Sequence, residues 1–254
     1  MVSPAWQNFI AEIARWRESG QQVDFWWRDD DACRPDPALT RLITLANRTA
    51  VPLALAVIPG DARADAFDPA SAMVSVLQHG IDHRTRAAAG EKKTEFSAAE
   101  PVHEALKRLL RGRTQLEQLV GTQALPVLVP PWNRISAPQL VEHLAGAGYR
   151  GLSCFGPRRS RYAAPGVVLV NTHVDIIDWR GSRGFVGEDI ALELATRHLQ
   201  ARRSGLADAG EPTGWLTHHA VHDEAAWAFM ERLLELTGSA TGVSWLGAPA
   251  IFGS

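Results

Sequence analysis

At 254 residues, with 46% hydrophobic and 21% charged residues, the chain has the composition of an ordinary globular protein. Its net charge of −2 gives no basic surface for nucleic acid, and no run approaches the roughly 18 apolar residues of a membrane span. Cys33 and Cys154 form no disulfide framework, and the N-terminus lacks the apolar core of a signal peptide. We therefore expect a cytoplasmic protein that binds neither nucleic acid nor membrane, with its oligomeric state left open.

Strand-like and helix-like patterns alternate along the chain. The N-terminal residues 1–20 are amphipathic and predict a helix. Apolar runs predict strands at 23–28, 51–58, 73–77, 125–129, 149–154, 167–170, 215–217 and 243–246. Helical spacing predicts helices at 35–49, 98–120, 138–146, 190–203 and 224–236. The alternation predicts one α/β domain over residues 1–254, with a barrel at 23–246.

Five polar clusters follow apolar runs, and they favour a barrel over an open sheet. The clusters cover residues 28–31, 79–83, 130–134, 175–179 and 217–219. In a barrel of parallel strands, catalytic side chains come from the C-terminal ends of several strands. An open doubly wound sheet usually carries a glycine-rich phosphate loop, and the chain has none. The segments 60–70 and 84–97 are predicted to be loops over the barrel mouth.

Acids and histidines in these clusters suit metal-assisted hydrolysis. His79 and His83 are separated by three residues, which suits a first-row metal ion when an acid from residues 29–31 joins them. Such a metal makes hydroxide available near neutral pH and polarises a carbonyl oxygen. The three aspartates alone are equally consistent with a helix cap or a solvated turn. A second metal cluster at residues 218–222 is disfavoured because its pattern is not HExxH.

Other cluster residues suggest further roles. The two prolines at 130 and 131 fix the backbone, so the N–H of Trp132 could donate to an oxyanion, although a plain turn would use the same residues. Asp175 and His218 form a candidate pair in which the carboxylate supports a histidine acid. Tryptophans beside the clusters suit a sugar-binding wall, but core packing explains them as often.

Taken together and in order, the clusters resemble the motifs of the polysaccharide deacetylase family, the NodB-homology carbohydrate esterases. Residues 28–32 resemble its TFDDG motif, His79 to His83 its H[ST]xxH motif, and residues 129–132 its RxPY motif. Asp175 to Trp179 matches DxxDW in full, and residues 216–218 match LxH. The resemblance covers residues 23–236 and implies a distorted (β/α)7 barrel.

The resemblance also implies a role for each matching residue. Asp30 would be the general base and His218 the general acid, with Asp175 orienting the acid and Trp132 supplying the oxyanion donor. The metal ligands would be Asp31, His79 and His83. The ion would be zinc, with cobalt, manganese, nickel or iron as alternatives. The expected substrate-binding residues are Trp27, Pro131, Asn133, Arg134, Trp179 and His219.

The chain departs from the family pattern at the arginine that orients the base. That position is Val129, and Arg28 or Arg134 would have to replace the arginine. Gly80 takes the place of the hydroxyl residue in the second motif, and the run of three aspartates leaves open which two act.

We expect a metal-dependent deacetylase that acts on an N-acetylated sugar, small or oligomeric, or on a related amide. The alternatives are a barrel that binds carbohydrate or regulates without turnover, and a hydrolase of a non-sugar C–N bond in a small metabolite.

Overall fold

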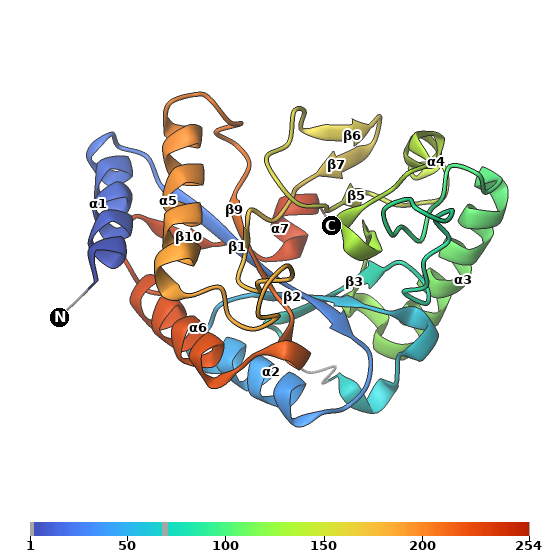
Figure 1. The fold of residues 1–254 in the computed structure, drawn as a ribbon, viewed down its shortest axis with the longest axis horizontal. Helices are drawn as coiled ribbons and strands as arrows, with labels where there is room; N and C mark the ends of the chain where they lie inside the picture. The colour runs from blue at the N-terminus through green and yellow to red at the C-terminus, as the bar shows by residue number, and fades with distance from the viewer. Residues whose placement is uncertain (1–2, 68–70, 254) are drawn as a thin grey trace.

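The computed structural model describes residues 3–67 and 71–253 (Figure 1). Helices and strands alternate as expected, with the longest strand, β1 (Val23–Ala32), running diagonally through the centre. The other strands are β2 (Leu53–Val57), β3 (Val74–His79), β4 (Ala124–Val129), β5 (Gly151–Leu152), β6 (Tyr162–Ala164), β7 (Val167–Leu169), β8 (Val174–Asp175), β9 (Thr213–Thr217) and β10 (Val243–Trp245). The α-helices are α1 (Pro4–Glu18), α2 (Pro37–Thr49), α3 (Val102–Val120), α4 (Pro138–His143), α5 (Glu188–Arg203), α6 (Glu224–Thr237) and α7 (Ala248–Phe252).

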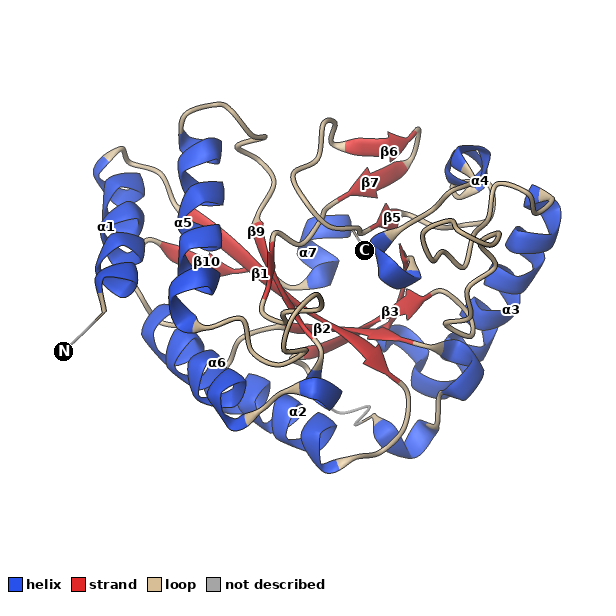
Figure 2. Cartoon of the chain, viewed as in Figure 1, coloured by secondary structure: helices blue, strands red, loops and turns tan. Residues whose placement is uncertain are grey.

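The strands form one twisted, mainly parallel sheet with helices outside it (Figure 2). Its order is β6-β7-β5-β4-β3-β2-β1-β9-β8, and β10 pairs with the start of β1. The segment 167–175 links the two ends of this path, because the N–H of Val170 donates to Leu152 O and the N–H of His173 donates to Gly214 O. The ladder itself is not closed. The expected distorted (β/α)7 barrel is thus confirmed, with an interruption between β7 and β8.

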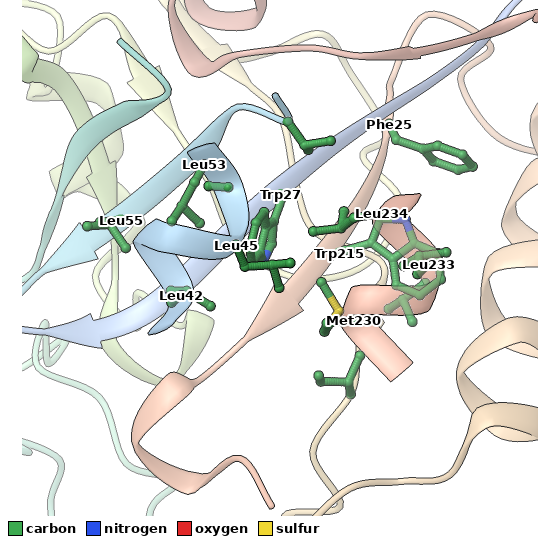
Figure 3. Close-up of a cluster of buried hydrophobic side chains, with 14 of the residues drawn as sticks. Phe25, Trp27, Leu42, Leu45, Leu53, Leu55, Trp215, Met230, Leu233 and Leu234 are labelled. Atoms are coloured by element: carbon green, nitrogen blue, oxygen red, sulfur yellow. The ribbon is translucent and has the colours of Figure 1, made fainter. Parts of the chain in front are cut away.

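The largest apolar cluster lies between the centre of the sheet and helices α2 and α6. Figure 3 shows Phe25 and Trp27 of β1 beside Trp215 of β9, with leucines of α2, β2 and α6 around them. Because helices cover parallel strands, these strands consist of nearly continuous apolar runs. Trp27 is 1% exposed, so it packs in this core. The structure therefore lends no support to its expected contact with substrate.

The N-terminal helix packs on α5, as Figure 1 shows. Ser3 caps α1 by accepting from the N–H of Trp6, and Pro4 takes the first helical position, where no N–H is needed. Buried Trp6 and Phe9 join the main core cluster. The prediction of a helix at 1–20 is therefore confirmed for 4–18, whereas residues 1–2 lie outside the described part.

Some boundaries differ from the expected ones. The helix predicted from residue 98 begins at Val102, because Pro101 holds the extended conformation of an N-cap. The short antiparallel strand β6 and the C-terminal helix α7 were not predicted, since runs of three to five residues carry too little periodicity. The expected loop 60–70 contains two single 3₁₀ turns at Pro59–Asp61 and Ala64–Ala66, and residues 68–70 lie outside the described ranges.

None of the helices in the described ranges is long and apolar enough to cross a bilayer. The assignment of residues 1–254 to a single domain stays a prediction.

Candidate active site

The polar clusters meet at one end of the sheet. Strands β1, β3, β4, β8 and β9 are joined by parallel pairings, so their C-terminal ends lie on the same side. Those ends carry the three aspartates of β1, His79 of β3, the 130–134 turn after β4, Asp175 of β8 and His218 after β9. The structure therefore brings the five clusters to one site.

Asp31, His79 and His83 form a compact donor set. Asp31 Oδ1 lies 3.1 Å from His79 Nε2 and 3.4 Å from His83 Nε2. All three donor atoms lie within 4.8 Å of one another. His79 is buried, whereas the side chains of Asp31 and His83 are 35% and 28% exposed, so the set opens towards solvent on one side.

A hydrogen bond fixes His79 in the tautomer whose Nε2 is free to bind a metal ion. Its Nδ1 lies 3.0 Å from Val129 O, and because a carbonyl only accepts, Nδ1 carries the proton. In the neutral ring, Nε2 then has a free lone pair that faces the carboxylate of Asp31. Asp31 Oδ1 is buried and finds no hydrogen-bond donor within the described residues. Two acceptors at this distance fit a shared divalent cation, and an Asp-His-His set suits a first-row metal.

The charges in this set depend strongly on one another. Burial alone would raise the pKa of Asp31, but the two histidines and His218 hold it well below its usual range. Burial lowers the pKa of His83. Burial also opposes charge on His79, yet Asp30 and Asp31 raise its pKa above the ordinary value. The site therefore attracts positive charge.

Each of the three adjacent aspartates has different partners. Asp29 is fully buried and accepts from Thr217 Oγ1, from the N–H of His219 and from the His219 ring. Asp30 pairs with Arg28, and Asp31 faces the histidines. This division separates a structural carboxylate, Asp29, from the two that remain for chemistry, which are Asp30 and Asp31.

The Asp29–His219 pair holds the end of β1 against the turn after β9. Burial opposes charge on both groups. Their mutual attraction nevertheless lowers the pKa of Asp29 and raises that of His219 to about 9. His219 is 3% exposed and engaged by Asp29, so the structure lends no support to its expected contact with substrate. Trp27 Nε1 donates to Thr217 Oγ1 in the same network.

Arg28, one of the two expected replacements for the arginine of the third motif, pairs with Asp30. Its Nε and Nη2 donate to the two oxygens of Asp30 at 2.8 and 3.0 Å, and its side chain is fully buried. Residues two apart on a strand share a face, which explains how one strand supplies both partners. The guanidinium also donates to Asn133 Oδ1 and Ser153 Oγ. Arg134 instead donates to Lys93 O.

Replacing Arg28 should therefore be far more damaging than replacing Arg134. Arg28→Met leaves the buried carboxylate of Asp30 without its cation and should lower the free energy of unfolding by about 3–5 kcal/mol. Arg134→Met removes one partly exposed hydrogen bond and should cost about 1 kcal/mol or less. Urea unfolding of both variants checks this. Equal losses would contradict the assignment of Arg28 to the pair.

Backbone strain concentrates at the site. Of the six non-glycine residues with positive φ in the described ranges, four are Asp31, His83, Trp132 and Asn133, with φ of 73, 52, 56 and 52°. Each such conformation costs about 1–3 kcal/mol for a non-glycine residue and persists where surrounding structure enforces it. Strained backbone therefore gathers at the end of β1, in the loop that carries His83 and in the 130–134 turn.

The 130–134 turn lies beside the loop that carries His83. The Trp132 ring packs on the His83 ring, with centroids 4.5 Å apart. Pro131 is buried, and Asn133 is held by Arg28. Trp132 therefore borders the donor set, while Asn133 is linked to Asp30 through Arg28.

The opposite side of the site is formed by Asp175, Trp179 and His218. Trp179 Nε1 and the N–H of Ile177 donate to the Asp175 carboxylate. The Trp179 ring is 39% exposed and packs on the edge of His218, with centroids 4.7 Å apart. Burial raises the pKa of Asp175, and nearby His218 opposes that rise. His218 Nδ1 has no hydrogen-bond partner among the described residues. Trp179 contacts both Asp175 and His218, and the orientation of His218 by Asp175 stays a prediction.

A second histidine cluster lies at the other end of β9. His173 and His198 stack with ring centroids 3.5 Å apart, next to buried Glu211. His173 Nδ1 accepts from the N–H of Gly214, so its Nε2 carries the proton and cannot ligate a metal ion while the ring is neutral. Buried Arg202 lies close by, which also disfavours a cation. We interpret this cluster as structural.

This cluster predicts a loss of stability in acid. Burial, His173 and Arg202 lower the pKa of His198 to about 2. The unfolded chain binds a proton at an ordinary pKa near 6.5, so stability falls as pH decreases below that value, by up to about 1.4 kcal/mol per pH unit. In urea unfolding at pH 7 and pH 5, the wild type should lose more stability than His198→Gln. Equal losses would contradict a neutral buried His198.

No protein-family model matches the chain, and no curated protein matches it. Solved structures do match. A Mycobacterium smegmatis protein assigned as a polysaccharide deacetylase superposes with a TM-score of 0.64 at 18% identity, covering 90% of this chain and 88% of that one. A Streptococcus mutans CE4 esterase superposes with a TM-score of 0.55 at 10% identity, over 89% and 86%. The Bacillus cereus polysaccharide deacetylase Bc1974 superposes with a TM-score of 0.51 at 14% identity, covering 89% of this chain and 92% of that one.

The chain has the polysaccharide deacetylase fold. The resemblance drawn from the five clusters is thus confirmed for the fold over about nine-tenths of the chain. At these low identities, the likeness to polysaccharide deacetylases says nothing by itself of the reaction, which has to be argued from the site.

Proposed function

We propose that the chain is a metal-dependent hydrolase that removes an acetyl group from an N-acetylated sugar or a related amide. The observation that carries this proposal is the Asp31–His79–His83 donor set, which lies beside a paired Asp30 at the C-terminal ends of the strands. Deacetylases share the fold, which supports the reaction class.

The ligands would be Asp31, His79 and His83, with zinc as the expected ion and cobalt, manganese, nickel or iron as alternatives. When bound, such an ion polarises the amide carbonyl and lowers the pKa of water.

The protein's own groups would move the protons. Asp30 takes a proton from the attacking water, and Arg28 donates to both of its oxygens and so fixes their direction. The N–H of Trp132 donates to the oxygen that becomes negative in the transition state. His218 gives a proton to the departing amine. Trp179, the exposed aromatic ring at His218, would pack on a sugar ring.

The alternative of a binding protein without turnover rested on the absent third-motif arginine. Arg28 provides an equivalent pair with Asp30, and this weakens the alternative. Hydrolysis of a non-sugar C–N bond in a small metabolite uses the same groups and stays open to test. The expected cytoplasmic location stays a prediction.

Acetate release tests the proposal. The purified protein is stripped with a chelator and assayed with added Zn²⁺, Co²⁺ or Mn²⁺ on N-acetylglucosamine, on its oligomers and on small N-acetylated amines. We expect release only with metal, and preferentially from the sugars. Release from the amines alone would favour the metabolite hydrolase. No release from any compound, with metal bound, would favour the binding protein.

A further inference from the structure

A four-residue segment of the loop over the site is buried as deeply as the core. Thr94, Glu95 and Phe96 are 0% exposed and Ser97 is 5% exposed, although they belong to the loop predicted at 84–97. Loop residues normally lie on the surface, because their backbone groups need water. This segment therefore has a specific task inside the protein.

The carboxyl group of Glu95 accepts hydrogen bonds from the backbone of residues 81–83, the loop that carries His83. The N–H of Ile81 donates to Oε1 at 2.8 Å, and the N–H of His83 donates to Oε2 at 3.2 Å. Burial and the nearby Asp82 raise the pKa of Glu95 to about 7. The two hydrogen bonds tie the backbone of Ile81 and of His83 to one side chain. They fix the turn in which His83 keeps its strained φ of 52°.

The residues on either side of Glu95 bind the 130–136 turn. Thr94 Oγ1 donates to Arg134 O at 3.1 Å, and the N–H of Ser136 donates to Phe96 O at 2.9 Å. The segment 94–96 thus connects the loop that carries His83 with the turn that carries Trp132.

Gly80 is explained by the same arrangement. A Cβ at this position would overlap Glu95 Oε2 and would lie 2.7 Å from Pro131 Cδ, and Gly80 has a φ of +55°. Only glycine fits here. The family that the chain resembles has a serine or threonine at this position. Here glycine leaves room for the carboxyl group of Glu95.

An ion pair with Arg86 does not explain why Glu95 is buried. Arg86 Nη1 is 3.8 Å from Glu95 Oε1, but the Arg86 guanidinium is engaged at 2.8 and 3.0 Å by Asp82. The short contacts of Glu95 are those to Ile81 and His83.

We propose that Glu95 is a positioning residue that holds His83 in the geometry for metal binding by accepting hydrogen bonds from the backbone of residues 81–83. Its effect on metal affinity rests on the proposed function, whereas its hold on the loop does not.

Amide exchange and metal binding in Glu95→Ala test this proposal. In the metal-free protein, hydrogen exchange resolved by NMR should be about tenfold faster or more at the amides of Ile81 and His83. Zinc affinity measured by competition with a chelator should fall about 10–100-fold, as for other residues that orient ligands. Glu91→Ala is the matched control, because Glu91 lies in the same loop and its carboxylate accepts from the N–H of Ala88 rather than from the loop that carries His83; it should change neither quantity.

Unchanged exchange and unchanged zinc affinity in folded Glu95→Ala would overturn the proposal. If that variant does not fold, Glu95→Gln decides, because its single carbonyl oxygen can serve one of the two N–H groups fully; wild-type protection at both amides would contradict the proposal. A wild-type protein that binds no zinc would contradict the proposed function, and the exchange rates would still decide whether Glu95 holds His83.

Discussion

Asp31→Ala should abolish stoichiometric metal uptake, and with it acetate release. The reason is that Asp31 Oδ1 faces both His79 Nε2 and His83 Nε2, at 3.1 and 3.4 Å. Removing it leaves two neutral imidazoles, which hold a divalent ion far more weakly than a set with a carboxylate. His79→Ala should have the same effect. Metal content after dialysis and zinc titration of the purified variants measure both.

Two matched controls separate this result from a general loss of charge or histidine. Asp61→Ala removes a half-exposed carboxylate near the end of β2 that pairs with Arg34, and His103→Ala removes an exposed ring on α3. Neither should change metal content. Full metal occupancy in both Asp31→Ala and His79→Ala would show that the ligand assignment is wrong.

Asp30→Asn should keep the metal and lose turnover. An amide cannot take the proton of the attacking water, so kcat should fall by about 10²–10⁴-fold. Asp30 does not belong to the donor set around Asp31, so zinc affinity should stay within a few-fold of wild type. Steady-state kinetics at saturating zinc and a zinc titration on the same preparation measure the two quantities.

The fold of this variant needs its own control, because Arg28 would lose the charge that it neutralises. The guanidinium keeps its contacts with Asn133 and Ser153, and a cooperative thermal transition shows whether the variant stays folded. A folded, zinc-loaded Asp30→Asn with wild-type kcat would contradict the role of Asp30 as base. Asp29→Asn provides a contrast, since it should lower stability through His219 rather than act on the proton transfer itself.

Strand ends were the part of the site most readable from the sequence. Apolar runs identify buried parallel strands, and polar residues at their ends then fall on one side of a barrel without further information. This is why His79, His83, His218 and an acid from residues 29–31 were expected at one site, whereas the choice of Asp31 rested on the family resemblance. Strands of two or three residues, such as β5, β6 and β8, were harder, because pairing with neighbours rather than local pattern forms them.

The sequence alone could not show which of the three adjacent aspartates act in the site. Identical side chains in a row have no local feature that distinguishes them, and only tertiary partners separate Asp29 from Asp30 and Asp31. The pairing of Arg28 with Asp30 did have a signal, since residues two apart on a strand share a face. That signal was outweighed by the expectation of an arginine at position 129.

Contacts over long loops were not predictable. Glu95 is a charged residue in a polar stretch, and its burial depends on two N–H groups twelve and fourteen residues away. The packing of Trp27 in the core has the same origin, because an aromatic residue next to an acid can face either side of a strand. In both cases the sheet twist and the packed helices decide the outcome.

The most direct test of the account is a crystal structure of the zinc-soaked protein with anomalous data collected at the zinc absorption edge. We predict one strong peak within about 2.0–2.2 Å of Asp31 Oδ1, His79 Nε2 and His83 Nε2, with Asp30 and His218 facing it. A peak elsewhere, or none at this set while zinc is bound in solution, would contradict the proposed metal centre and the hydrolase built on it.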